Sequence, residues 1–147
     1  MTTGGTGQML LVEDNPHDLE LAMRTFGKAG VAERVQFARD GAEALDRLFG
    51  DATRPVHAES DNLGLVVLDL HLPKVDGQEI LRRIKSDART KHIPVVVLTS
   101  SRELKDVAEC YRLGANSYVI KPVSSEEYAL VVRTLGVYWL QFNHPPK

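Results

Sequence analysis

The sequence has one cysteine, no long apolar run and no excess of basic charge. Because Cys110 has no second cysteine for an internal disulfide, we expect the protein in a reducing cytoplasm. The longest apolar stretches, residues 63–70 and 93–98, are far shorter than the roughly 20 residues that span a bilayer. Lys and Arg number 18 against 20 Asp and Glu, and the mixed signs exclude the clustered basic face of a nucleic-acid-binding protein.

Signals for secretion and nucleotide binding are also missing. The first residues have no charged region followed by an apolar one, so no secretory signal is expected. Gly4, Gly5 and Gly7 precede the first predicted strand, whereas a dinucleotide-binding turn follows its strand, and no Walker A pattern occurs. What remains is a chain of 147 residues, 43% hydrophobic and 26% charged, which is typical of one folded domain with a sizeable core.

Short apolar runs alternate with longer segments of helical period from residue 9 onward. The runs predict strands at residues 9–12, 35–38, 65–69, 94–98 and 117–120. Repeated βα units of this kind predict an α/β fold with a doubly wound parallel sheet. Residues 1–8 are expected to be a disordered lead-in, residues 51–62 a surface loop, and residues 143–147 a tail after a domain of residues 9–142.

Helix signals lie between these strands. Asp14 or Asn15 can cap the first helix, with Pro16 at its first position, and Gly30 can end it. The fourth helix carries an apolar stripe made of Leu104, Val107, Ala108 and Tyr111. The last helix, residues 124–142, has an apolar surface wider than one sheet needs: Tyr128, Val131, Val132, Leu135, Tyr138, Trp139 and Phe142.

Polar side chains follow four of the predicted strands. The carboxyl ends of parallel strands share one edge of the sheet, so we expect these side chains to meet. They are Glu13 and Asp14 after the first strand, Asp69 as the last residue of the third, Thr99 after the fourth and Lys121 after the fifth. Singly, most can be helix caps or solvated charges, but Asp69 follows a strongly apolar run, and burying a carboxylate without a partner is costly.

Together these groups predict a chemistry. Two carboxylates about 4 Å apart repel by on the order of 4 kcal/mol at an effective dielectric near 20, so a cation is needed among them. Oxygen ligands with no cysteine or suitably spaced histidine favour Mg²⁺ over zinc. A carboxylate beside Mg²⁺ and an ammonium group can attack a phosphoryl group and form an aspartyl phosphate, with Thr99 hydrogen-bonding the product.

The same stretches resemble the receiver domains of two-component response regulators. They are LLVEDNPHD, VVLDLHLPKVDG, VVVLTSS and NSYVIKPV, in the order and at the strand ends that the family shows. The resemblance implies a flavodoxin-like (βα)5 sheet in the order 2-1-3-4-5. It further implies that Asp69 accepts the phosphoryl group, that Lys121 pairs with it, and that Thr99 and Tyr118 form a switch pair in which the ring swings inward. The Mg²⁺ ligands it implies are Glu13, Asp14, Asp69 and the backbone carbonyl of His71.

A narrower resemblance is to the single-domain regulators partnered with phytochrome-type histidine kinases. It is carried by EDNPHD, the long loop before the third strand, GANSYVIKPV and the YWL near the end. It implies a light-sensing kinase as phosphodonor and a homodimer built on the fourth and fifth helices and the fifth strand. The wide apolar surface of the last helix favours such an interface. The alternative is that Trp139 and Phe142 fold back on their own core.

We therefore expect a single-domain response regulator that works in a phosphorelay and switches its interaction surface, with output through protein contact. It is expected to be a phosphoacceptor that can catalyse its own phosphorylation and dephosphorylation, rather than an enzyme with a separate substrate. Two alternatives stay open. One is a dimeric scaffold that works without phosphorylation. The other is a Mg²⁺-dependent phosphatase of the dehalogenase-like type, which requires a second aspartate at the position of His71.

Overall fold

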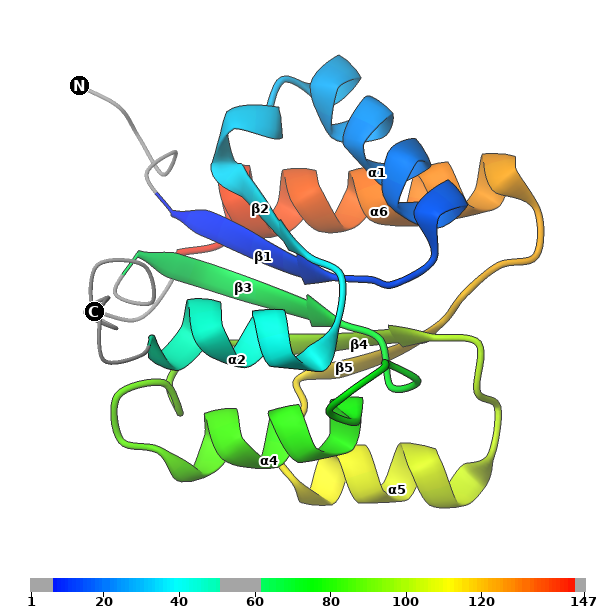
Figure 1. Cartoon of the computed structure of the whole chain (residues 1–147). Coiled ribbons are helices and arrows are strands. Elements are labelled where there is room, and N and C mark those ends of the chain that lie inside the picture. The colour runs from blue at the N-terminus through cyan, green and yellow to red at the C-terminus, as the bar shows by residue number, and fades with distance from the viewer. Residues whose placement is uncertain (1–6, 51–61, 145–147) are drawn as a thin grey trace.

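The computed structural model describes residues 7–50 and 62–144. The predicted lead-in up to residue 6, the loop at 51–61 and the tail at 145–147 lie outside the described residues. The strands are β1 (Gln8–Val12), β2 (Val35–Ala38), β3 (Leu63–Leu68), β4 (Val95–Thr99) and β5 (Ser117–Ile120). They pair in parallel in the order β2-β1-β3-β4-β5, which confirms the predicted topology (Figure 1).

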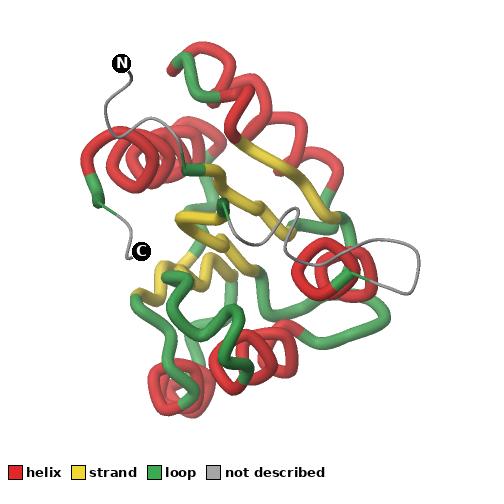
Figure 2. Tube along the Cα trace, turned by 90° about the vertical axis from the view of Figure 1, so that its left-hand side faces the viewer, coloured by secondary structure: helices red, strands yellow, loops and turns green. Residues whose placement is uncertain are grey.

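Helices cover both faces of the sheet. Helices α1 and α6 lie on one face, and α2, α4 and α5 lie on the other (Figure 1), with the strands between them in the turned view of Figure 2. Of the described helices, none has both the length and the apolarity to cross a bilayer. The bounds are α1 (Pro16–Ala29), η1 (Ala32–Arg34), α2 (Gly41–Phe49), α4 (Gly77–Ser86), α5 (Leu104–Arg112), α6 (Ser125–Val137) and η2 (Tyr138–Phe142).

The element boundaries follow the capping signals closely. The side chain of Asn15, not that of Asp14, caps α1 by accepting a hydrogen bond from the amide of Asp18 at 3.0 Å. Helix α1 ends at Gly30, whose left-handed φ of 78° suits a residue without a Cβ. Strand β3 ends at Leu68, one residue before the predicted end, so Asp69 stands just beyond the strand.

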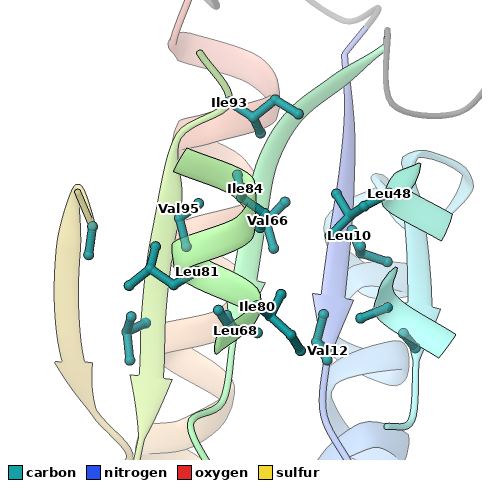
Figure 3. Close-up of a cluster of buried hydrophobic side chains, with 14 of the residues drawn as sticks. Leu10, Val12, Leu48, Val66, Leu68, Ile80, Leu81, Ile84, Ile93 and Val95 are labelled. Atoms are coloured by element: carbon teal, nitrogen blue, oxygen red, sulfur yellow. The ribbon is translucent and has the colours of Figure 1, made fainter. Parts of the chain in front are cut away.

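The core has two halves because alternate residues of each strand point to opposite faces. Leu10, Val12, Val66 and Leu68 are buried against α2 and α4. Figure 3 shows Val66 and Leu68 beside α4 and Leu10 beside Leu48 of α2. The intervening strand residues pack against α1 and α6: Met9, Leu11, Leu65 and Val67. All six residues of β3 are buried, so the central strand is held on both sides and fixes the position of Asp69 at its end.

Two expectations about buried faces need correction. The apolar stripe predicted for the fourth helix faces outward on α5, where Leu104 is 84% and Tyr111 50% exposed, and Cys110 is the buried residue instead. Helix α5 lies beside β5 at the edge of the sheet, so little of its surface meets the core. In the last helix, Trp139 packs against the core as the alternative supposed, but Phe142 stays 69% exposed.

We expect Gly77→Ala to destabilise the fold at the base of the site. A Cβ at Gly77 would lie 2.2 Å from the carbonyl oxygen of Asp69 and 2.6 Å from the Cα of Leu70, so backbone must move. The free energy of unfolding, measured by urea denaturation, should fall by about 2 kcal/mol or more. The control is Gly27→Ala in α1, where a Cβ meets nothing within 4 Å. It should raise stability by up to about 1 kcal/mol, and equal effects of the two changes would contradict the packing described.

Candidate functional site

Three carboxylates gather where β1 and β3 end. Each of Glu13, Asp14 and Asp69 offers an oxygen that lies within 4.8 Å of the oxygens of the other two. Glu13 and Asp69 are 1% and 7% exposed, while Asp14 is exposed to solvent. The two strands are neighbours and point the same way, so their ends bring these residues together as predicted (Figure 1).

Backbone amides fix the two buried carboxylates. The amide of Asp69 donates to the carbonyl of Val12 at 3.3 Å and so extends the pairing of β1 with β3 by one residue. One oxygen of the Asp69 carboxylate accepts a hydrogen bond from the amide of His71 at 3.3 Å. Glu13 Oε2 accepts one from the amide of Asn15 at 2.9 Å. Each buried carboxylate therefore has one oxygen held by the chain and one left for a cation.

That second oxygen faces Lys121, which follows β5. The Lys121 Nζ atom lies 2.7 Å from Glu13 Oε1 and 3.1 Å from Asp69 Oδ2. The Lys121 side chain is only 12% exposed, and its amide donates to the carbonyl of Thr99 at 2.8 Å. The predicted ammonium group is thus inside the carboxylate cluster, where it offsets part of the negative charge.

Asp18 is a member of the cluster that sequence reasoning missed. Its Oδ2 atom lies 3.2 Å from Lys121 Nζ. Asp18 is in the first turn of α1, three residues after the cap Asn15, where an acidic residue complements the helix dipole in any protein. The spacing of Asp18 could have indicated its position, because it lies about one helical turn along the chain from the carboxylates that follow β1.

Burial and charge act against each other on the two central groups. Burial raises the pKa of Glu13 above its usual 4.5, although the hydrogen bond and charge of Lys121 lower it in part. Burial also lowers the pKa of Lys121, but the hydrogen bond and charge of Glu13, together with Asp69, outweigh burial and raise it overall. Lys121 is therefore charged at neutral pH, and the ionised form of Glu13 depends on it.

The two predicted switch residues meet at a third residue, Ser101. Thr99 is fully buried at the end of β4, and its Oγ1 faces the amide of Ser101 at 3.5 Å. The hydroxyl of Tyr118 donates to the carbonyl of Ser101 at 3.0 Å, and its ring packs against the core half under α4. Burial raises the pKa of Tyr118, so the hydroxyl stays a neutral donor.

The carboxylates suit a divalent cation. Three carboxylates, those of Glu13, Asp18 and Asp69, contact the ammonium group of Lys121, and Asp14 lies beside two of them, so the cluster is negative. The donors are all carboxylate oxygens, and Asp14 keeps the cluster open to solvent. Hard cations such as Mg²⁺ and Mn²⁺ bind such oxygens and retain several waters. The residues present therefore fit a divalent ion with part of its coordination left for another ligand.

Known proteins are similar to this chain in sequence. The profile of the response regulator receiver domain matches residues 9–133. The chain is 43% identical over 140 residues to the probable methanogenesis regulatory protein FilR2 of Methanothrix harundinacea, covering 94% of this chain and 86% of that protein. It is 34% identical over 133 residues to the response regulator Rcp1 of Synechocystis, covering 90% of this chain and 88% of that protein.

Solved structures share the fold over nearly the whole chain. The crystal structure of the phosphorylated cyanobacterial phytochrome response regulator RcpA has a TM-score of 0.86 and 35% identity, covering 96% of this chain and 99% of that one. The Mn²⁺-bound form of Rcp1 has a TM-score of 0.85 and 33% identity, with the same coverage of 96% and 99%.

Replacing Lys121 by Met should destabilise the protein in a pH-dependent way. Without the ammonium group, Glu13 and Asp69 stay buried with no opposite charge, and breaking a buried ion pair costs about 3 kcal/mol. The pKa of Glu13 should rise further, so the folded state binds more protons than the unfolded state above pH 4.5. Stability therefore falls as pH rises, and the deficit against wild type should shrink as pH drops from 7 to 5.

The control for this variant is Lys105→Met. Lys105 is exposed and contacts only the exposed Glu103, at 3.4 Å, among the described residues. The Lys105→Met protein should have the thermal unfolding temperature of wild type at both pH 7 and pH 5, as measured by circular dichroism. A Lys121→Met protein with wild-type stability at pH 7 would contradict the charge balance described for the site.

Proposed function

Because this chain belongs to the response regulator receiver domain family, we propose that Asp69 accepts a phosphoryl group from a histidine kinase in a Mg²⁺-dependent reaction. We take residues 9–142 as the receiver domain. The observation that carries the proposal is the meeting of Glu13, Asp14, Asp69 and Lys121 at one edge of the sheet. The proposed nucleophile, the proposed divalent-ion site and a fixed positive charge then lie within a few ångströms of one another, as phosphoryl transfer requires.

The transfer is a displacement at phosphorus. A carboxylate oxygen of Asp69 forms the new P–O bond while the P–N bond of a phosphohistidine breaks, and the imidazole nitrogen leaves with the electron pair. Lys121 already contacts Asp69 Oδ2 and is charged at neutral pH, so it can pair with an oxygen of the arriving phosphoryl group. The amide of His71 holds the other carboxylate oxygen and fixes the orientation of the nucleophile.

The proposed metal ligands are Glu13, Asp14, Asp69 and the backbone carbonyl of His71. When bound, Mg²⁺ would neutralise negative charge on the transferring phosphoryl oxygens. The similarity to Rcp1, which was solved in a Mn²⁺-bound form, supports binding of a divalent ion, and the acidic cluster supports this place for it. The choice of Mg²⁺ follows from hard oxygen ligands.

The proposed response is a population shift read by other proteins. Thr99 would move its hydroxyl toward the phosphoryl group, and Tyr118 would be held inward, so that the surface above β5 differs between the two states. We further propose that the protein is a phosphoacceptor in the cytoplasm that can catalyse its own phosphorylation and dephosphorylation, rather than an enzyme with a separate substrate. A phytochrome-type kinase is the proposed donor, supported by the similarity to the phytochrome response regulator RcpA.

A homodimer through α5, β5 and α6 is the proposed assembly. Strand β5 is an edge of the sheet, and its four residues are only half-buried. The apolar stripe of α5 faces outward beside it, with Leu104 and Tyr111 exposed, and Val123 after the strand is fully exposed. Apolar side chains exposed side by side favour a covered interface. A dimer that forms equally with and without phosphorylation would instead favour the scaffold alternative.

We expect phosphorylation to occur on Asp69 alone. Incubation with Mg²⁺ and a small phosphodonor should add the mass of one phosphoryl group in intact-protein mass spectrometry. Asp69→Asn should abolish the adduct, because an amide is no nucleophile toward phosphorus. Removal of Mg²⁺ by a chelator should suppress it by at least about tenfold.

The matched control is Asp76→Asn, which neutralises an exposed aspartate in the loop after β3, outside the carboxylate cluster. It should be phosphorylated like wild type. An adduct that survives Asp69→Asn would refute the assignment, and turnover of aryl phosphates by the wild type would favour the phosphatase alternative.

The proposed dimer predicts a monomer when its apolar contacts are removed. The double variant Leu104→Glu, Tyr111→Glu places charge on the outward stripe of α5 and should sediment as a monomer at concentrations where wild type dimerises. Met23→Glu, at an exposed position of α1, a helix outside the proposed interface, should leave the dimer intact. Sedimentation of each protein with and without a phosphoryl mimic measures both points, and a monomeric wild type in all conditions would refute the dimer.

A further inference from the structure

Ser101 connects the two switch residues to the beginning of α5. Its backbone amide faces Thr99 Oγ1 at 3.5 Å, and its backbone carbonyl accepts the hydroxyl of Tyr118 at 3.0 Å. Its side-chain oxygen accepts the amide of Glu103, the cap residue of α5, at 3.3 Å. Any displacement of Ser101 therefore changes the surroundings of both Thr99 and Tyr118.

Asp106 holds Ser101 from the first turn of α5. Asp106 Oδ2 accepts the hydroxyl of Ser101 at 2.6 Å, a short distance typical of a hydrogen bond to a charged acceptor. Its other oxygen, Oδ1, accepts a hydrogen bond from the side-chain amide of Gln78 in α4 at 3.3 Å. One carboxylate thus ties α5 to α4 and, through Ser101, to Tyr118 of β5.

Helix capping alone does not account for this arrangement. An acidic residue in the first turn of α5 would complement the helix dipole without any partner. Asp106 instead uses both oxygens on defined donors from two other segments, and one of those donors comes from a neighbouring helix. The hydroxyl of Ser101 donates its one hydrogen bond to Asp106, and its oxygen can therefore accept one from the backbone amide of Glu103.

We propose that Asp106 is a positioning residue that, through Ser101, holds Tyr118 inward and so couples the state of Asp69 to the α4–α5 surface. This inference rests on the proposed function. The carboxylate of Asp106 contacts Ser101 and Gln78 rather than the acidic cluster, so it acts on the switch pair and not on the phosphoryl chemistry.

Linkage gives the direction of the effect. If a phosphoryl group favours the inward Tyr118, then whatever stabilises the inward Tyr118 must tighten binding of a phosphoryl group by the same factor. Losing hydrogen bonds to Asp106 should therefore weaken binding of beryllofluoride, a phosphoryl mimic, by roughly fivefold, because a hydrogen bond to a charged group contributes about that factor or more. Affinity for Mg²⁺ alone should not change, since the carboxylate cluster is intact.

The test compares Asp106→Ala and Ser101→Ala with Glu109→Ala. Glu109 lies on the same helix and pairs only with Arg112 among the described residues, so its removal controls for losing a carboxylate from α5. Mg²⁺ affinity and beryllofluoride affinity are measured by calorimetry, and the Tyr118 signal is followed by nuclear magnetic resonance. We expect both test variants to bind Mg²⁺ with wild-type affinity and beryllofluoride about fivefold more weakly. The change in the Tyr118 chemical shift on adding beryllofluoride should be smaller than in wild type. In Asp106→Asn the side-chain oxygen can still accept from Gln78, while the nitrogen donates to Ser101 Oγ and so reverses that hydrogen bond; this variant should recover part of the affinity.

Several results would overturn the inference. One is wild-type beryllofluoride affinity in both Asp106→Ala and Ser101→Ala. Another is an equal loss of Mg²⁺ and beryllofluoride binding, which would mean general damage to the site. Should Asp106→Ala fail to fold, Ser101→Ala removes a single oxygen and decides the question alone. If the wild type binds Mg²⁺ but no beryllofluoride, the proposed function itself is wrong, and this inference with it. That result differs from a loss of beryllofluoride binding in the variants alone, which leaves the proposed function standing.

Discussion

The ion cluster around Lys121 is the interaction on which the site depends. Glu13 and Asp69 are nearly inaccessible to solvent, and isolated carboxylates in such positions would take up protons rather than remain charged. Lys121 reaches both from the end of β5, although β4 stands between β5 and β3 in the sheet. The strand order therefore fixes the charge balance: each strand delivers its residue to the same edge, where one ammonium group contacts both buried carboxylates and offsets part of their charge.

Much of this arrangement could be predicted from local sequence patterns. The apolar runs of β3 and β4 are continuous because both faces of these strands are covered, and such runs predict central parallel strands. Parallel strands share a direction, so the residue after each run is known to lie at a common edge. Glu13, Asp69 and Lys121 could be placed on that reasoning alone, and the resemblance to receiver domains added the order of the strands.

Other features depend on packing between distant segments and left no local pattern. Asp18 has the position of an ordinary helix-dipole residue, and only the approach of Lys121 makes it part of the cluster. The apolar stripe of α5 has the period of a core-facing helix, yet its position beside an edge strand leaves it exposed. The hydrogen bond from Ser101 to Asp106 joins residues only five apart in the sequence. It connects separate elements only because the fold brings Gln78 to Asp106 and Tyr118 to Ser101.

The same charge balance constrains how the site can change state. Lys121 contacts Glu13, Asp18 and Asp69 together, so a phosphoryl group that draws Lys121 toward itself weakens the compensation of the other two carboxylates. In the proposed function, a divalent ion bound by Glu13 would supply positive charge where Lys121 withdraws it. Binding of the ion and of the phosphoryl group would then favour each other, because they bring opposite charges to one cluster. In the proposed function, transfer of one anionic group to this pocket would redistribute the contacts of the buried Lys121, which follows β5, and β5 also carries Tyr118.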